Sequence, residues 1–275
     1  TPVYTPFFSI IKDANREIVT NSLIYDGSRY EFDFDDLEEK MKGGVKAFVF
    51  CSPHNPVGRV WTKDELKKIA DLALKYDVLV LSDEIHADLV FKPNKHIPIA
   101  SLSEEISDQT ITFMSPTKTF NLASLQISYI VSTNTKKRVQ LEKQLALQGF
   151  RMLNVMGIVG LDAAYRHGQA WLDRLLKIIE ANKHYAIKRL TEETERKVSV
   201  LDAEGTYLLW LDFKQLNMSD KDLQRFLIEK AKIGLNAGSS YGVDGEQFMR
   251  MNIACPKETV AAGVDRIVHA IRDFL

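Results

Sequence analysis

Short apolar runs rich in β-branched residues alternate along the first half of the chain with longer segments of helical periodicity. The runs have the length of strands, and a strand buried on both faces is apolar throughout. They lie at residues 45–51, 78–82, 110–114 and 127–132. Strands that alternate with helices in this way form a mainly parallel sheet with crossover helices, so we expect an α/β fold.

The helix predicted at residues 62–76 carries its own start signal. Thr62 and Glu65 have the spacing of a capping box, in which the hydroxyl and the carboxylate each satisfy a backbone N–H at the helix start. Leu66 and Ile69 then begin an apolar face,. The pattern therefore predicts an amphipathic helix between two strands.

The pattern changes near residue 170, where a long and highly charged helical segment begins. The elements predicted from there on are helices at residues 171–196, 219–232 and 258–275 and strands at 198–201, 207–213 and 248–254. We expect two domains, a larger α/β domain over residues 1–170 and a smaller α+β domain over residues 171–275.

Composition and charge narrow the class of protein. The chain has 275 residues, of which 45% are hydrophobic and 27% charged, so it can bury a substantial core and is neither disordered nor fibrous. The chain has 36 Lys and Arg residues and 37 Asp and Glu residues, for a net charge of -1. It therefore has no excess of positive charge that would attract a polyanion such as nucleic acid. We therefore expect a small-molecule partner and no nucleic acid.

Several sequence features bear on location. No apolar run reaches the roughly 20 residues that a membrane span needs, and the first ten residues lack the layout of a secretory signal,. Cys51 and Cys255 form no CxxC motif and fit a reducing compartment,. We expect a cytoplasmic protein with no membrane association. The histidines show no spacing typical of metal ligands, so we expect no metal.

Three polar residues follow predicted strands of the first half. Asn55 follows the first strand, Asp83 the second and Lys118 the third, and ligands of an open parallel sheet collect beyond the carboxyl ends of its strands. Each residue alone has an ordinary explanation, as a turn residue, a helix cap or a surface lysine. Together an amide, an acid and an amine suit pyridoxal phosphate, whose aldehyde needs a lysine and whose ring nitrogen needs an acid.

Four sequence strings carry a family resemblance. They are CSPHNPVGRVWTKDEL, SDEIHADLV, SPTKTFNLASLQISY and FMRMNIACP, and 28 residues separate Asn55 from Asp83 and 35 more separate Asp83 from Lys118. In this order and spacing they resemble the fold-type I pyridoxal-phosphate enzymes of the class I/II aminotransferase family, in the carbon–sulfur β-lyase (cystathionine β-lyase-like) branch. The resemblance covers essentially the whole chain.

The resemblance implies roles for the three residues that follow the strands. Lys118 would form the Schiff base with the cofactor and later move the substrate Cα proton. Asp83 would lie against the pyridine nitrogen and keep it protonated, so that the ring accepts electrons. Asn55 would donate a hydrogen bond to the phenolic oxygen O3′.

Further residues match family positions, each with an alternative. Tyr4 would stack on the cofactor ring or belong to the core, and Ser115 would bind phosphate or cap a strand end. Arg250 would bind the substrate carboxylate with its planar fork or lie on the surface. His86 stands where many aminotransferases have a tyrosine that reaches O3′, or is structural. Gln126 stands where many have a phosphate-binding arginine, so the phosphate charge must be met otherwise.

The implied reaction is β-elimination on L-cystathionine or a related cysteine S-conjugate, which yields a thiol, pyruvate and ammonia. An aminotransferase would use the same residues as far as removal of the Cα proton, and residue types neither separate the two reactions nor identify the preferred sulfur amino acid. An alternative of another class is an aminotransferase-like sensor domain of a regulator.

The resemblance also bears on assembly and completeness. Family members are generally homodimers, which implies a homodimer in the intact protein. The N-terminal arm and glycine-rich phosphate loop of the family precede the position of Thr1, so we expect an N-terminally truncated chain. Without the backbone donors of that loop, a fragment would hold its fold but bind the cofactor weakly and be inactive.

Overall fold

The chain folds into two units, and each unit is assembled from separate stretches of sequence. The computed structural model describes residues 1–150 and 152–274. The first unit comprises Thr1–Asp33, His54–Arg59 and Leu175–Leu275, and the second comprises Phe34–Pro53 and Val60–Arg174. This division differs from a single boundary near residue 170, because the N-terminal segment and one short loop group with the C-terminal part. The assignment of domains stays a prediction.

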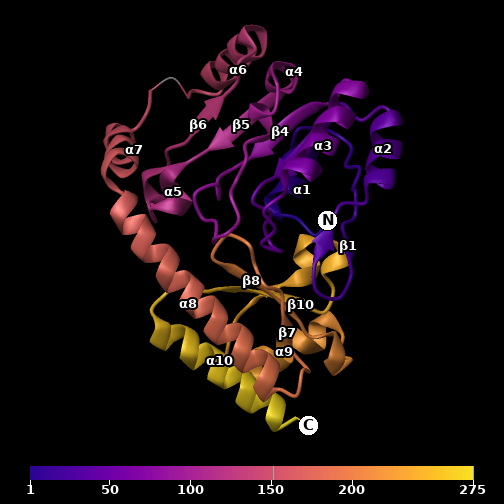
Figure 1. Ribbon diagram of the computed structural model, residues 1–275, viewed down its shortest axis with the longest axis vertical. Helices are drawn as coiled ribbons and strands as arrows, with labels where there is room; N and C mark the ends of the chain where they lie inside the picture. The colour runs from indigo at the N-terminus through magenta and orange to yellow at the C-terminus, as the bar shows by residue number, and fades with distance from the viewer. Residues whose placement is uncertain (151, 275) are drawn as a thin grey trace. The chain divides into compact units, whose positions relative to one another are not determined.

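A four-stranded sheet forms the centre of the second unit, in the order β3-β4-β5-β6 (Figure 1). Its strands are β3 (Ala47–Cys51), β4 (Leu79–Asp83), β5 (Thr110–Met114) and β6 (Tyr129–Val131). The first three are parallel, and β6 is antiparallel to β5. The predicted α/β class and mainly parallel sheet are therefore confirmed, although the fourth predicted strand is shorter than expected and reverses direction.

Helices connect these strands in the second unit. They are α2 (Phe34–Lys42), α3 (Lys63–Lys75), α4 (Glu104–Asp108), α5 (Pro116–Thr119), α6 (Thr135–Leu147) and α7 (Val155–His167), with 3-10 turns η1 (Ile99–Ser101) and η2 (Ala123–Leu125). The capping box predicted for α3 is present, since Thr62 Oγ1 accepts from Glu65 N and Glu65 Oε2 accepts from Thr62 N at 2.7 Å. Leu66 and Ile69 are fully buried, as the apolar face of the sequence predicts.

An antiparallel sheet forms the centre of the first unit, in the order β7-β8-β10-β9. Its strands are β7 (Ser199–Val200), β8 (Leu208–Asp212), β9 (Asn236–Ala237) and β10 (Phe248–Asn252). Four successive residues of β8 are buried, and because side chains alternate between faces, both faces of this strand are covered. Trp210 of β8 stacks on Phe248 of β10, with ring centroids 5.2 Å apart.

Helices α8 and α10 run side by side in the first unit (Figure 1). The helices and short strands of this unit are α1 (Pro6–Asp13), β1 (Ile24–Tyr25), β2 (Tyr30–Glu31), α8 (Gln169–Glu193, whose first turns belong to the second unit), α9 (Asp220–Glu229) and α10 (Lys257–Arg272). Its 3-10 turns are η3 (Lys214–Leu216), η4 (Gly238–Tyr241) and η5 (Val243–Gly245). The helix predicted at 258–275 thus ends at Arg272, and Leu275 lies outside the described residues. None of the helices described is both long and apolar enough to cross a bilayer.

Candidate active site

The predicted site residues fall into two sets, one in each unit. Those of the second unit are Asp83, His86, Ser115 and Lys118, and those of the first unit are Tyr4, Asn55 and Arg250.

Asp83 and Lys118 follow neighbouring parallel strands of the second unit. Asp83 is the last residue of β4, and Lys118 lies on α5, which begins directly after β5. Burial raises the pKa of Asp83, and the negative charge of Glu84 raises it further. The hydrogen bond that Asp83 accepts from Ile85 N at 3.1 Å lowers this pKa. The charge of Lys118 also lowers this pKa, and the cofactor roles of both residues stay a prediction.

Ser115 caps the helix that carries Lys118. Its hydroxyl donates to the Ile127 carbonyl at 2.7 Å and accepts from Thr117 N at 3.1 Å. Ser115 thus stands at the end of β5, where the sequence offered a strand-end cap as an alternative, and caps the helix that begins there. Its role toward phosphate stays a prediction. Gln126 takes a left-handed conformation at φ 49° between η2 and β6, and its neutral amide cannot replace the charge of an arginine.

Asp88 was missed by the sequence analysis although it lies in the string SDEIHADLV. Thr119, which is fully buried, donates its hydroxyl to Asp88 Oδ2 at 2.8 Å. Because Thr119 directly follows Lys118, this hydrogen bond fixes the backbone from which the lysine side chain extends. The signal that could have found Asp88 is its place five residues after Asp83.

A second buried acid follows Asp83. Glu84 is 1% exposed, accepts from Ser82 Oγ at 2.8 Å and lies 2.8 Å from Nε2 of His96. Both carboxylate oxygens therefore have partners, as a buried charge requires. His86 is buried in the turn that follows β4, three residues after Asp83. Its role toward O3′ stays a prediction.

Arg250 is the centre of the set in the first unit. Its Nη1 donates to Asn55 Oδ1 at 3.0 Å and its Nη2 donates to Asn236 Oδ1 at 3.1 Å, while its guanidinium lies 5.0 Å from the centre of the Tyr241 ring. Only the amide oxygen of Asn55 can accept from a guanidinium. The Asn55 amide oxygen is therefore the atom bound to Arg250, and donation from the amide nitrogen to O3′ stays a prediction.

Tyr4 joins this set through its neighbours. Val3 N donates to the Tyr241 carbonyl at 2.9 Å and Thr5 Oγ1 donates to the Ser240 carbonyl at 3.0 Å, so the segment that carries Tyr4 runs along η4. The Tyr4 ring itself packs edge-on against Phe7, with centroids 5.6 Å apart.

The charge of Arg250 acts on two tyrosines of the first unit, Tyr207 and Tyr241. Burial raises the pKa of Tyr207 and of Tyr241, and in both cases the charge of Arg250 lowers the pKa and the proximity of Tyr4 raises it. Asn236 and Tyr241, which contact Arg250, and Tyr207 were not predicted from the sequence, because only the pairing of distant strands and turns brings them near Arg250.

The residues present fit pyridoxal phosphate and an amino-acid carboxylate. Asp83 supplies an acid at the end of β4 and Lys118 an amine on the helix after β5, which are the groups that the ring nitrogen and the aldehyde of the cofactor need. The Arg250 Nε is buried and has no hydrogen-bond partner among the residues described, so the guanidinium keeps donors for a carboxylate. In the same described residues, no group of three or more His, Cys, Asp or Glu side chains could hold a metal ion.

The family model "Aminotransferase class I and II" matches residues 1–267 of the chain. The chain belongs to this family, and the resemblance stated from the four strings is confirmed.

Its relatives include lyases of sulfur amino acids. The chain is 40% identical over 271 residues to cystathionine beta-lyase PatB of Bacillus subtilis, covering 98% of this chain and 70% of that protein. It is 30% identical over 270 residues to cystathionine beta-lyase of Corynebacterium glutamicum, covering 98% and 70%.

Solved structures agree with these sequence matches. Cystalysin from Treponema denticola, which contains a pyridoxal 5'-phosphate cofactor, superposes with a TM-score of 0.97 at 37% identity, covering 100% of this chain and 70% of that one. The PLP-bound C-S lyase from Staphylococcus hominis superposes with a TM-score of 0.89 at 31% identity, covering 98% and 69%.

Proposed function

We propose that the site residues of this chain serve β-elimination on L-cystathionine or a related cysteine S-conjugate. The protein is a pyridoxal-phosphate-dependent carbon–sulfur β-lyase, and its cofactor is pyridoxal phosphate. The reaction breaks the Cα–H and Cβ–S bonds and consumes one water, so that a thiol, pyruvate and ammonia leave. The observation that supports the assignment best is the set of Lys118, Asp83, Asn55 and Arg250, all present at the family positions.

Lys118 and Asp83 act on opposite parts of the cofactor in this proposal. Lys118 would hold the cofactor aldehyde through its amine, and the same amine would take the proton from the substrate Cα. Asp83 holds the pyridine nitrogen, where its carboxylate favours the protonated ring. The bound cofactor supplies an electron sink for the pair left at Cα.

Arg250 and Asn55 orient the reacting molecules. Arg250 has N–H groups that do not bond to Asn55 or Asn236, and these would bind the substrate α-carboxylate. Two hydrogen bonds to the carboxylate would fix the orientation of the substrate and therefore of its Cα–H bond. The Asn55 amide nitrogen would donate to O3′ of the cofactor. Tyr4 contributes an aromatic face to the ring, and Ser115, with the Thr117 hydroxyl 2.7 Å away, contributes to the phosphate site.

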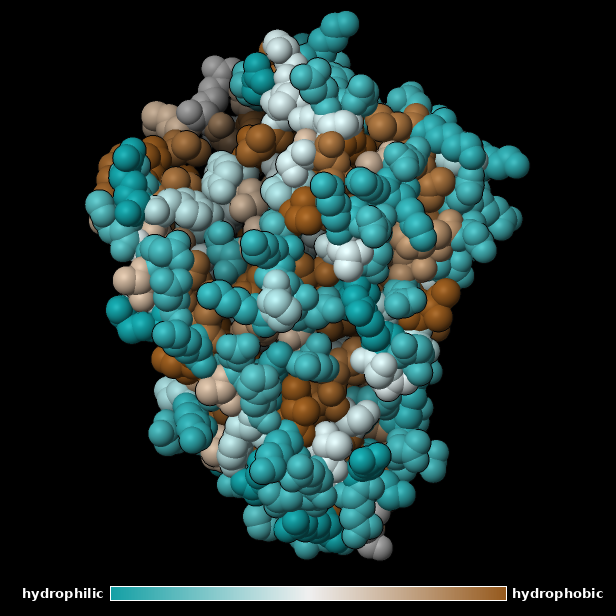
Figure 2. Space-filling view, viewed as in Figure 1, coloured by the Kyte–Doolittle hydropathy of each residue, from teal (hydrophilic) through white to brown (hydrophobic). Residues whose placement is uncertain are grey.

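A homodimer is supported by an exposed apolar surface on the second unit. Large hydrophobic residues are exposed from the end of α6 through α7, namely Leu147, Phe150, Met152, Leu153, Val155, Met156, Ile158 and Val159. In Figure 2 brown residues gather at the left, where Figure 1 draws α7. Contiguous apolar surface of this kind marks protein interfaces. Analytical ultracentrifugation should show a dimer, and Met156→Glu should weaken it whereas Val243→Glu, an exposed change in the first unit, should not.

Incubation of the complete protein with cystathionine and pyridoxal phosphate tests the reaction. We expect pyruvate and ammonia in equal amounts without any added keto acid. Turnover that depends on a keto acid and yields no pyruvate would establish transamination instead. The cytoplasmic location is part of the proposal, and fractionation of cells with an antibody against the protein tests it.

A further inference from the structure

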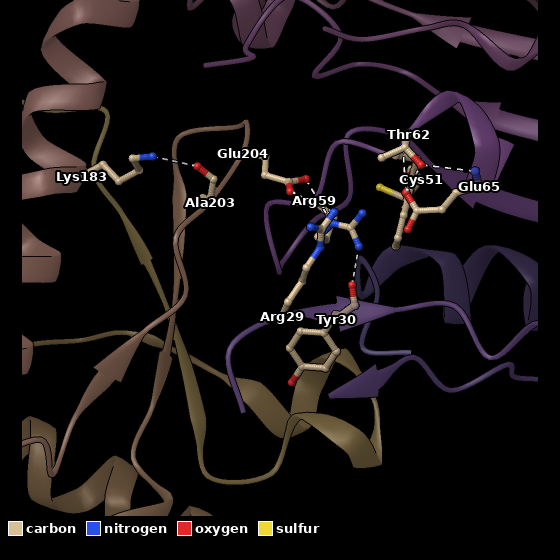
Figure 3. Close-up of polar contacts among 10 residues, drawn as sticks. Arg29, Tyr30, Cys51, Arg59, Thr62, Glu65, Lys183, Ala203 and Glu204 are labelled. Carbon is tan, nitrogen blue, oxygen red and sulfur yellow. Dashed lines mark hydrogen bonds and ion pairs between the residues drawn. The ribbon is translucent and has the colours of Figure 1, made fainter. Parts of the chain in front are cut away.

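Two arginines converge on one carboxylate in the first unit (Figure 3). Arg59 Nε lies 3.0 Å from Glu204 Oε2 and Arg29 Nη2 lies 3.2 Å from Glu204 Oε1. We call Arg29, Arg59 and Glu204 the Glu204 cluster. The side chain of Arg59 is only 4% exposed, and a buried guanidinium is stable only while its charge is paired and its N–H groups are bonded.

Arg59 has a second partner in the same unit. Its Nη1 donates to the Tyr30 carbonyl, so the guanidinium is held by a carboxylate on one side and by the backbone of β2 on the other (Figure 3). A planar fork with several donors can bind both partners at once, whereas a lysine ammonium is a single point charge. The hydrogen bonds of the Arg59 side chain to Glu204 and to the Tyr30 carbonyl therefore hold the Arg59 backbone in place.

The loop of residues 54–59 is closed on itself. His54 N donates to the Arg59 carbonyl at 2.8 Å, and Gly58 N donates to the His54 carbonyl at 2.8 Å. Asn55 lies within this loop, so its backbone moves with that of Arg59. Fixing Arg59 therefore limits where the Asn55 amide can be.

The loop also fits closely against the turn that carries Glu204. The Gly58 carbonyl accepts from Glu204 N at 2.8 Å and from Gly205 N at 3.1 Å. Gly58 has φ +74°, and a Cβ added there would lie 2.5 Å from Ala203 Cβ. Only glycine allows this approach without displacement. The Glu204 cluster thus adds charge pairing to a contact already made by the backbone.

The turn and Arg250 are joined through the antiparallel sheet. The chain runs from Glu204 into β8, and Trp210 of β8 pairs with Arg250 of β10. Arg250 Nη1 then returns to Asn55 Oδ1 at 3.0 Å. The contacts form a closed circuit, from Arg59 through Glu204, β8 and β10 to Arg250, and back to Asn55.

We propose that Arg59, through Glu204, is a positioning residue that holds Asn55 in register with Arg250 for carboxylate binding. The inference rests on the proposed role of Arg250. Neutralising Glu204 removes the carboxylate charge that pairs with the buried Arg59. The loop then loses part of its attachment to the turn and shifts, and the Asn55 amide no longer orients the Arg250 guanidinium. The carboxylate site loosens although Arg250 itself is intact.

The test measures binding of propionate, a carboxylate without an amine, to the holoenzyme, from the change it causes in the cofactor absorption. Glu204→Gln keeps the shape of the side chain and removes its charge. Glu193→Gln is the matched control, because Glu193 also pairs with two arginines of the first unit, Arg189 and Arg272. We expect the propionate Kd to rise about tenfold in Glu204→Gln and to stay within about twofold of wild type in Glu193→Gln.

A double-mutant cycle separates positioning from general loss of structure. In an Arg250→Lys background the effect of Glu204→Gln on the propionate Kd should disappear. An equal effect in both backgrounds, or equal effects of Glu204→Gln and Glu193→Gln, would overturn the proposal. If Glu204→Gln does not fold, Arg59→Lys is measured in its place and should raise the propionate Kd by less than about tenfold. An unchanged Kd in folded Arg59→Lys would also overturn the proposal.

The readout keeps this inference distinct from the proposed function. Propionate binding needs no turnover, so it reports on Arg59 and Glu204 even if cystathionine yields no pyruvate. A weaker but still measurable propionate Kd in Arg250→Lys shows that the carboxylate site is where the proposal requires it. Wild-type binding in Arg250→Lys would refute the role of Arg250 and, with it, the positioning role of Arg59.

Discussion

Thr119 donates a hydrogen bond to Asp88 at 2.8 Å and thereby ties the residue after Lys118 to the turn that follows Asp83. Both groups lie in the second unit, and Thr119 is fully buried. The tie joins two of the sequence strings that identify the family, which the sequence presents as separate motifs.

Thr119→Val should destabilise the protein by about 1–3 kcal/mol, because it removes the hydroxyl that donates to the partly buried Asp88 carboxylate,. Thr110→Val is the control: Thr110 is also buried, but its hydroxyl donates at 2.6 Å to a neutral acceptor, the Ile106 carbonyl. Urea unfolding should show a smaller loss of about 0.5–1.5 kcal/mol for the control. Equal losses would mean that the charge of Asp88 is irrelevant.

Lys118→Ala should abolish the covalent link to the cofactor, because no other amine takes its place on α5. Borohydride reduction followed by peptide mass spectrometry should find the cofactor on the Lys118 peptide of the wild type and on no peptide of the variant. Lys95→Ala, a change at an exposed lysine, should leave the label on Lys118. A label that persists in Lys118→Ala would contradict the assigned role.

Asp83→Asn should change how the stability of the cofactor-free protein depends on pH. Burial raises the pKa of Asp83 above its ordinary value of 3.8, so the folded state binds this proton more tightly than the unfolded state. Its stabilising contribution is complete below the unfolded pKa and is lost as pH rises through the folded pKa.

Near neutral pH the wild type has to bury a charged Asp83 carboxylate, whereas the amide of Asp83→Asn carries no charge. The variant should therefore be more stable than the wild type at neutral pH. Thermal unfolding across pH 3 to 8 checks the sign, with the range set by the ordinary carboxyl pKa of about 4. A variant that is less stable than wild type at neutral pH would show that another contact of Asp83 outweighs its burial. The same variant should lose β-elimination activity, because a neutral amide does not favour the protonated ring.

Arg250→Lys should weaken substrate binding more than it slows the bound complex. Loss of a charge-assisted hydrogen bond costs about 1.5–3 kcal/mol, which corresponds to roughly 10- to 100-fold in KM. Steady-state kinetics with cystathionine measures the split between KM and kcat. A substrate amine analogue that lacks the carboxylate should bind the variant and the wild type equally.

Gly58→Ala should destabilise the protein by more than about 1 kcal/mol, because it combines a positive φ with a Cβ placed 2.5 Å from Ala203 Cβ,. Gly27→Ala separates the two causes, since Gly27 has φ +99° but no atom within 4 Å of the added Cβ. Denaturant unfolding should therefore give a larger loss for Gly58→Ala. Equal losses would mean that the contact with Ala203 adjusts at no cost.

Elements whose signals are local were predictable from the sequence. The capping box of α3 lies within four residues, and β4 and β5 are continuous apolar runs, so their bounds were predicted within one or two residues. The direction of β6 was not predictable, because an apolar run of three residues carries no information about the polarity of its pairing. Helix α6 buries no residue and so has no apolar face to reveal it.

The site shows the same division between local and distant signals. Asp83, Lys118 and Arg250 lie in strings with family motifs, and each falls at a strand or directly after one. Glu204, the carboxylate that pairs with Arg59, is 145 residues away in sequence, and Asn236 meets Arg250 only because β9 pairs with β10. Such partners depend on the pairing of distant segments, which hydrophobic periodicity does not encode.

The grouping of residues 54–59 with the C-terminal part has a consequence for building chimeras from related enzymes. A crossover at residue 174 looks harmless by chain order, yet Asn55 would then come from one parent and Glu204 from the other. Parents that differ at Gly58, Arg59 or Ala203 would yield hybrids in which an imported loop meets an unmatched turn. Moving the short loop together with residues 175–275 would preserve the pairing, even though the two segments are far apart in the gene.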